Sequence, residues 1–561
     1  MPQHPVVSPV SSSVLPCDAS SGASSGPGRR PASPTLCLLA IAAALAGACS
    51  GSMGGSTGTG GTDTSTGGTG GTTGTGGTNT GGTTGTGGSS SSGTGGAIPG
   101  TGGSGTGGKM AGTGGSGTGG SGTAGHMGAG GSSVAGSSGA GGSGPGTGGS
   151  GNANAYNPNF VEFYGSDCTV ASPKDVSISG QLPNLFTEFD GTTMSKRSDW
   201  RCRRAELKAV VEKYIHGPKP GAPDMVTGSV STTAIKVHAV QGGKSIDFSV
   251  PISIPSGAKM PAPIIIGLGG SSLDPGIVSA EGVATGTYDN QGMMSESSRT
   301  GLFTTLYGTS TGASSQIGWA WGFSRVIDVL ISEKAAGRNN IIDPTAVAVT
   351  GCSRDGKGAF TVGAFDERIA LGIPQESGTA GVSAMRIVNT QPKGPNGNPA
   401  QSLSNAVSTE VGWFGSTFES TYINKVDTIP GDTHSLAAMH APRGLLVLDN
   451  SRIGELCAPC QHAATAAAQV LYQAMGIGAN VGYNGGNPTD PQNHCTFYPT
   501  TQGPPLQRAI RGHLTRTAAP DGRMEPQPAG TADLTKWVPW SSTAPTLTND
   551  VSWSSPPLTS Q

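Results

Sequence analysis

Charged and aromatic residues are scarce in this sequence. Only 12% of its 561 residues are charged and only 5% are aromatic, whereas 96 residues are glycine. A globular domain usually has about 25% charged residues, and it needs large apolar side chains to build a core. The composition therefore excludes a chain that is globular over its whole length, and it predicts a long segment that buries no core.

A surplus of positive charge is also missing. The 32 lysines and arginines are balanced by 34 aspartates and glutamates, so the formal net charge is -2. Proteins that bind nucleic acid or anionic membrane surfaces through electrostatics carry a basic surplus or a basic patch. We therefore expect no nucleic-acid partner.

Hydrophobic runs long enough to span a bilayer are absent as well. The apolar residues 36–45 follow Arg29 and Arg30 and are too few for a membrane-spanning helix, which is typical of an export signal. The signal ends at Cys49 in a segment, LAGACS, that is similar to a bacterial lipobox. We predict that residues 1–49 are a signal peptide and that the protein is exported to the cell surface. A lipid on Cys49 is the only membrane contact that we expect. Plain secretion is the alternative.

Residues 50–151 consist almost wholly of glycine, serine and threonine and contain no aromatic residue. Such a segment behaves as a flexible coil, and roughly 100 residues reach about 50–60 Å on average. An adhesive low-complexity region would show aromatic or Gln/Asn spacing, which is missing here. We therefore predict a disordered linker over 50–151, followed by one catalytic domain over 152–561.

Six cysteines fall within residues 152–561, an even number that suits an oxidising compartment. Six cysteines allow fifteen connectivities, and their spacing does not choose among them. The Cys457-Ala-Pro-Cys460 motif precedes His462 and resembles a redox or metal motif, but no second ligand pair stands at a suitable spacing. No metal site is predicted.

A candidate nucleophile stands where a strand changes into a helix. The apolar residues 347–350 stop at Gly351 and Cys352, and small residues suited to helix packing begin after Ser353. A serine on such a turn has its hydroxyl lifted above the sheet, beside the backbone N–H groups that open the helix. The spacing is GxSxxG rather than the usual GxSxG, and an ordinary strand-to-helix turn is the alternative.

The segments before this turn alternate in the manner of strands. Residues 234–238 and 245–254 predict paired antiparallel strands, and residues 263–267 predict a buried parallel strand. That strand ends at Gly269 and Gly270, where an α/β-hydrolase has a loop that donates backbone N–H groups to an oxyanion. A simple glycine turn is the alternative.

Strands and helices alternate beyond this point. Residues 319–333 predict a helix, and residues 341–351, 369–373 and 441–450 predict strands. This alternation predicts an α/β-hydrolase three-layer sandwich with a mostly parallel sheet. Two of these strands end near an acidic residue, namely Glu376 and Asp449. Both would lie at the carboxyl edge of the sheet, where ligands bind.

The nine residues from Gly351 to Ala359, GCSRDGKGA, resemble the serine motif of the glucuronoyl esterases, carbohydrate esterase family 15. The resemblance extends to WAWG at 319–322 and PQESG at 374–378, and in pieces it covers about 182–540. It implies a serine esterase that cleaves the ester between 4-O-methyl-glucuronoyl groups of xylan and lignin alcohols. It implies no cofactor, and we expect the enzyme to be a monomer.

The resemblance also implies roles for individual residues. Ser353 matches the nucleophile, His494 the base, Glu376 the acid and Arg354 the residue that stabilises the oxyanion. The residues are in the order Ser, acid, His along the chain, which an α/β-hydrolase requires. In most α/β-hydrolases the acid follows a late strand, so Asp449 is the alternative acid.

Further matches concern the sugar and the disulfides. Lys357, Gln401 and Glu410 match residues that contact the sugar, whereas the tryptophan that the family commonly has near 449–454 is missing. The implied disulfides are Cys352 with Cys495 and Cys168 with Cys202, which leaves Cys457 to pair with Cys460.

Two other functions are compatible with parts of this pattern. A general carboxylesterase or acetyl xylan esterase shares serine, base and acid but has no need of Arg354 and Lys357 beside the nucleophile. An inactive carbohydrate-binding protein is expected to have lost a member of the triad.

Overall fold

The computed structural model describes residues 162, 168–409 and 412–551. The predicted signal peptide with Cys49 and the predicted linker therefore lie outside the described residues, and they remain predictions. Of the helices that are described, none is both long and apolar enough to cross a bilayer.

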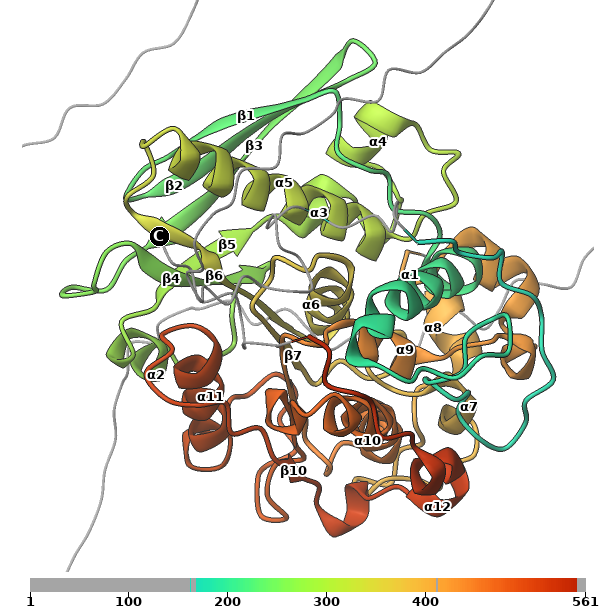
Figure 1. Cartoon of the computed structure of the whole chain (residues 1–561). Helices are drawn as coiled ribbons and strands as arrows, with labels where there is room; N and C mark the ends of the chain where they lie inside the picture. The colour runs from blue at the N-terminus through green and yellow to red at the C-terminus, as the bar shows by residue number, and fades with distance from the viewer. Residues whose placement is uncertain (1–161, 163–167, 410–411, 552–561) are drawn as a thin grey trace, which may run out of the picture. The chain divides into compact units, whose positions relative to one another are not determined.

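A 10-stranded mixed sheet runs through the described domain (Figure 1). The neighbours β1-β2-β3-β5 pair antiparallel, and the neighbours β5-β4-β6-β7-β8-β9-β10 pair parallel. The strands are β1 (Met225–Val230), β2 (Ala234–Gln241), β3 (Lys244–Ser253), β4 (Ala262–Leu268), β5 (Ala284–Tyr288), β6 (Ile342–Cys352), β7 (Leu371–Gln375), β8 (Gly444–Leu448), β9 (Val481–Asn484) and β10 (Met524–Glu525).

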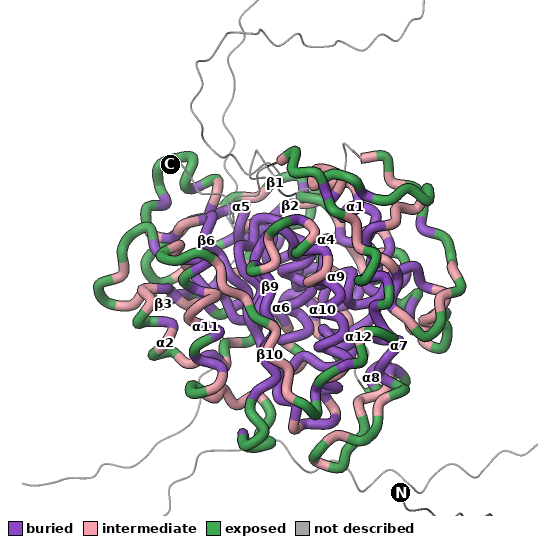
Figure 2. Tube along the Cα trace, turned by 60° about the horizontal axis from the view of Figure 1, so that its bottom comes forward, coloured by how far each residue is buried: buried purple, intermediate pink, exposed green. Residues whose placement is uncertain are grey.

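Helices cover both faces of the parallel part. They are α1 (Trp200–Val210), α2 (Pro275–Ala280), α3 (Asn290–Met293), α4 (Leu302–Tyr307), α5 (Ser315–Ala335), α6 (Arg354–Phe365), α7 (Met385–Val388), α8 (Leu403–Thr409), α9 (Thr433–Met439), α10 (Ala458–Ala474), α11 (Pro499–His513) and α12 (Leu534–Trp537). Helices α6, α9 and α10 are buried along most of their length (Figure 2).

The two faces are built by alternation along the strands, because successive side chains of a strand point to opposite sides. Ile264 and Ile266 of β4 belong to the hydrophobic cluster that includes α5 and α6. Ile265, between them, belongs to the separate cluster that includes Val278 of α2 and Leu506 of α11. This arrangement of helix, sheet and helix confirms the predicted three-layer α/β-hydrolase fold.

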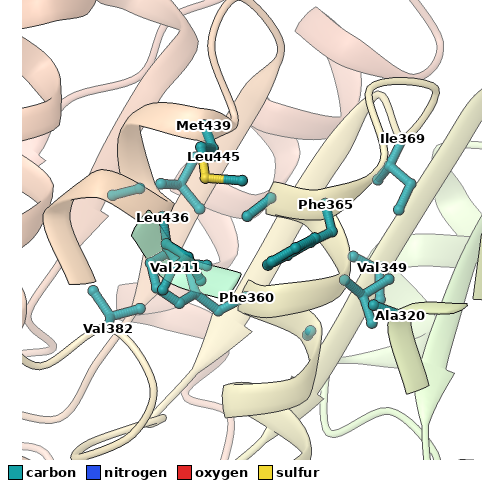
Figure 3. Close-up of a cluster of buried hydrophobic side chains, with 14 of the residues drawn as sticks. Val211, Ala320, Val349, Phe360, Phe365, Ile369, Val382, Leu436, Met439 and Leu445 are labelled. Carbon is teal, nitrogen blue, oxygen red and sulfur yellow. The ribbon is translucent and has the colours of Figure 1, made fainter. Parts of the chain in front are cut away.

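The larger cluster fixes α6 against its surroundings (Figure 3). Phe360 and Phe365 of α6 lie among Leu436 and Met439 of α9, with Val349 of β6 beneath, and each of these is at most 1% exposed. Full burial of one such side chain contributes about 1.5–3 kcal/mol. The helix that follows Ser353 is therefore held firmly on the sheet.

Most of the predicted elements are present. The antiparallel pair is β2 with β3, the buried strand is β4, and residues 319–333 lie within α5. The three later predicted strands correspond to β6, β7 and β8. Strands β1, β5, β9 and β10 and helices α10 and α11 were not predicted from the sequence.

Candidate active site

Ser353 stands between β6 and α6 in a conformation that few serines adopt. Its φ is 59° and its ψ is -123°, in the region of positive φ that costs about 1–3 kcal/mol for a residue with a side chain. Its N–H donates to the carbonyl of Gln375 at 3.0 Å, which ties the turn to the end of β7. Two residues before Ser353, position 351 requires glycine, because a Cβ there would lie 2.4 Å from the carbonyl oxygen of Asp355. The predicted strand-turn-helix is thus confirmed.

Glu376 directly follows β7 and is fully buried. Its N–H donates to the carbonyl of Leu448 at 2.7 Å, which fixes its backbone on the end of β8. Its Oε2 accepts hydrogen bonds from Nδ1 of His494 and from the N–H of Cys495, each at 2.7 Å. Because the His494 side chain is 43% exposed, a buried carboxylate here orients an imidazole that remains accessible.

Within the described residues three disulfides are formed, and they are the three that were predicted: Cys168–Cys202, Cys352–Cys495 and Cys457–Cys460. The second joins the residue before Ser353 to the residue after His494, which lie far apart in sequence. Ligand atoms of Cys352, Cys495, Glu376 and His494 all lie within 4.8 Å of one another. The two sulfurs are bonded to each other, so neither is available as a thiolate ligand for a metal.

Asp449 follows the neighbouring strand, β8, and is also fully buried. Its Oδ2 accepts a hydrogen bond from the hydroxyl of Tyr483 and its Oδ1 accepts one from the N–H of Asn450, each at 2.8 Å. Burial raises the pKa of Asp449 to about 7, and the nearby Glu376 adds to the rise. Of the two candidate acids, it is Glu376 that the structure brings to His494.

Two cations stand on the first turn of α6. Arg354 is half-exposed, and its guanidinium forms an ion pair with the buried carboxylate of Glu296. Lys357 is buried, donates to the carbonyl of Ser377, and has its Nζ 4.2 Å from the ring centroid of Trp413. Glu296 was not predicted from the sequence, because no motif surrounds it and its contact with Arg354 spans 58 residues.

Comparison with known proteins identifies the family of this chain. A family model described as glucuronyl esterase, fungi, matches residues 237–476. The 4-O-methyl-glucuronoyl methylesterase of Thermothelomyces thermophilus is 38% identical over 386 residues, which cover 68% of this chain and 92% of that protein. The corresponding enzyme of Hypocrea jecorina is 37% identical over 397 residues, with 68% and 80% covered.

The chain belongs to the glucuronoyl esterase family. A solved structure agrees, namely a mutant glucuronoyl esterase of Sporotrichum thermophile in complex with methyl 4-O-methyl-β-D-glucopyranuronate. It has 35% sequence identity and a TM-score of 0.60, and the match covers 68% of this chain and all of that one (100%).

The glycine loop after β4 contacts the surroundings of Ser353. Gly269 has a φ of 61°, and a Cβ on it would lie 2.9 Å from Oδ2 of Asp355. Ser272 donates to Oε1 of Gln375 at 2.6 Å, and Gln375 in turn bonds to the N–H of Ser353. Burial raises the pKa of Asp355 to about 6. The loop is thereby held beside the nucleophile, as its predicted role requires.

The predicted sugar-contacting residues are only partly described. Gln401 is half-buried; its carbonyl accepts from the hydroxyl of Thr379 at 2.6 Å, which ties it to the loop that follows Glu376. Its Nε2 donates to Asn405 at 3.1 Å. Glu410 lies outside the described residues, so its role remains a prediction.

The region from which the family tryptophan is missing is shaped by polar contacts. Glu455 accepts hydrogen bonds from the side-chain amides of Asn396, at 2.7 Å, and of Asn398. A cavity of about 350 Å³ lies beside this contact, between residues 391–395 and residues 451–459. A carboxylate held by two amides therefore stands where the resemblance would suggest an aromatic ring.

Proposed function

We propose that this chain hydrolyses the ester between a 4-O-methyl-glucuronoyl side group of xylan and an alcohol of lignin. The observation that carries the proposal is the contact of the buried Glu376 carboxylate with Nδ1 of His494, beside a serine on a nucleophile elbow. The relatives that cover this domain are named 4-O-methyl-glucuronoyl methylesterases, which supports the same substrate class.

In the proposed reaction, Oγ of Ser353 attacks the ester carbonyl while Nε2 of His494 takes the hydroxyl proton. Glu376 holds Nδ1 of His494, so it selects the ring tautomer and stabilises the imidazolium that forms. The tetrahedral intermediate collapses, the alcohol leaves with the proton from His494, and a glucuronoyl-Ser353 ester remains. Water, activated by His494, then releases glucuronate and restores Ser353.

Arg354 and the loop of Gly269 and Gly270 are proposed to stabilise the negative oxygen of the intermediate. A fixed cation or N–H group aimed at a developing oxyanion contributes about 3–4 kcal/mol in comparable sites. Lys357, Gln401 and Glu410 are proposed to bind the hydroxyl groups of the sugar ring. An enzyme for simple acetates has no need of this second set.

The experiment compares two substrates on the purified full-length chain. We expect efficient hydrolysis of benzyl glucuronate, weaker hydrolysis of an aryl acetate, and no change when a chelator is added. Efficient acetate cleavage without any glucuronate cleavage would assign the chain to the general carboxylesterases or acetyl xylan esterases. Failure on both substrates would indicate a carbohydrate-binding protein.

We further propose that the chain is exported and anchored by a lipid at Cys49, so that the linker over residues 50–151 lets the domain reach an insoluble substrate. Mass spectrometry of the mature N-terminus tests this proposal. An acylated Cys49 is the expected result, and an unmodified N-terminus on protein found in the medium would show plain secretion.

A further inference from the structure

Glu296 is a buried carboxylate that has partners on both of its oxygens. It lies between α3 and α4 and is 4% exposed. Its Oε1 pairs with the guanidinium of Arg354, and its Oε2 accepts a hydrogen bond from Nε1 of Trp413 at 2.9 Å. Its own N–H donates to the side chain of Gln291 at 3.1 Å, so the backbone is fixed as well. A buried carboxylate of this kind cannot move without losing charged and neutral bonds together.

The second partner, Trp413, reaches the other cation on α6. Its ring centroid lies 4.2 Å from Nζ of Lys357, within the range of a cation–π interaction. Trp413 is 5% exposed, and its carbonyl accepts a hydrogen bond from Gln316 at 2.9 Å. The indole is thus held at its N–H by Glu296 and at its backbone by Gln316, with Lys357 over its face.

We propose that Glu296 is a positioning residue that holds Arg354 in place for the oxyanion and, through Trp413, holds Lys357 in place for the sugar. The inference rests on the proposed function, because the roles of Arg354 and Lys357 come from it. Arg354 is half-exposed with a long, flexible side chain. A guanidinium that is already ordered loses less rotamer freedom when the oxyanion forms. Glu296 is not a catalytic residue in this scheme, because it acts through its neighbours.

The negative charge of Glu296 also acts in the opposite direction. A carboxylate beside Arg354 partly cancels the positive charge that the oxyanion needs. If orientation is unimportant, removal of this negative charge strengthens Arg354 and raises the rate. If orientation matters, its removal lowers the rate.

The test is Glu296→Gln, which keeps the shape and removes the charge. We expect kcat/KM to fall about ten- to a hundredfold on an aryl acetate, because the oxyanion step is shared by all esters. On benzyl glucuronate we expect the same loss in kcat and, in addition, a rise in KM. Glu206→Gln is the matched control, because Glu206 is a buried carboxylate that pairs with Arg203 at 2.7 Å on α1. Glu206→Gln should lower stability without lowering kcat/KM on either substrate.

A second variant, Trp413→Phe, keeps the proposal falsifiable if Glu296→Gln does not fold, and a double variant tests the coupling if it does. Trp413→Phe keeps a ring beneath Lys357 but removes the indole N–H that binds Glu296. This variant should lose more activity on benzyl glucuronate than on the acetate. Adding Glu296→Gln to Arg354→Ala should change acetate hydrolysis by less than about twofold, because one residue acts through the other.

Unchanged or increased activity of Glu296→Gln, or fully additive losses in the double variant, would overturn the proposal. Failure of the proposed function is a separate result. In that case the unmodified chain cleaves the acetate but not the glucuronate ester, and the acetate measurements still test the contact of Glu296 with Arg354.

Discussion

Two neighbouring strands end in buried acids, and only one of these acids contacts the histidine. Gln375 of β7 and Leu448 of β8 are paired in the sheet, so Glu376 and Asp449 follow at the same level of the carboxyl edge. Glu376 accepts two N–H hydrogen bonds from the segment of His494 and Cys495. Asp449 instead accepts the hydroxyl of Tyr483 from β9.

The difference shows that partners, not strand position, decide what a buried acid can do. Glu376 accepts the N–H of the imidazole itself, so its side chain lies against the ring that becomes an imidazolium. The pKa of Asp449 is raised to about 7 by burial, so near neutral pH a large fraction of this carboxyl group is protonated. A largely neutral carboxyl group that is bonded to Tyr483 links the end of β8 to β9, and it is poorly suited to stabilise a cation.

The largest expected effect comes from removing Ser353 or His494, the two residues that act together with Glu376 in the proposed reaction. Ser353→Ala and His494→Ala should each lower kcat on benzyl glucuronate about ten-thousandfold, and the double variant should lose little more, because the triad acts as a unit. Steady-state kinetics with the unmodified chain as reference measure this loss. If either single variant keeps a tenth of the activity, the elbow and the histidine are not the catalytic pair, and the comparison of acids loses its meaning.

Loss of the disulfide beside the triad should have a smaller effect on activity than loss of a triad residue. The bond between Cys352 and Cys495 closes 143 residues and holds His494 next to the elbow, so Cys352→Ser with Cys495→Ser should lower the free energy of unfolding by about 2–4 kcal/mol and kcat several-fold. Urea unfolding and kinetics on benzyl glucuronate measure the two losses.

The control for this experiment is Cys457→Ser with Cys460→Ser. That disulfide spans a sequence separation of only 3, so its removal should cost less stability and leave kcat unchanged. Equal losses of activity in both double variants would mean that the Cys352–Cys495 bond has no special role in orienting His494.

The smallest effect on activity is expected at Asp449, where the effect appears in stability and depends on pH. The folded pKa of about 7 lies above the ordinary value of 3.8, so the folded state keeps a proton that the unfolded state has lost, and stability falls as pH rises toward 7. Between pH 5 and pH 8 this costs roughly 2–3 kcal/mol. Asp449→Asn removes the ionisation, so its stability relative to the unmodified chain should increase from pH 5 to pH 8 in urea unfolding. An identical pH dependence in both proteins would show that Asp449 is ionised throughout.

The sequence could predict the features that depend on neighbouring residues. The turn at Ser353 and the alternation of the parallel strands are local patterns, and both are present. Helix α11 was not predicted, because Pro504 and Pro505 lie inside it and proline normally ends a helix. Strand β9 has only four residues, which is too short for a periodic signal.

The features that depend on distant contacts could not be predicted from the residues alone. The choice between Glu376 and Asp449 is made by the path of the loop that brings His494 back to β7, across 118 residues. Glu296 reaches Arg354 in the same way, through the fold and not through a motif. The family resemblance indicated Glu376 as the acid, but it gave no indication of a role for Glu296.

The most direct test of this account compares Glu376→Gln with Asp449→Asn on benzyl glucuronate at one pH near 7. We predict that Glu376→Gln lowers kcat by about a hundred- to ten-thousandfold, because the amide can no longer stabilise the imidazolium of His494. We predict that Asp449→Asn stays within about threefold of the unmodified chain, because an asparagine can still accept the hydroxyl of Tyr483. The reverse ranking would contradict the account and assign the acid role to Asp449.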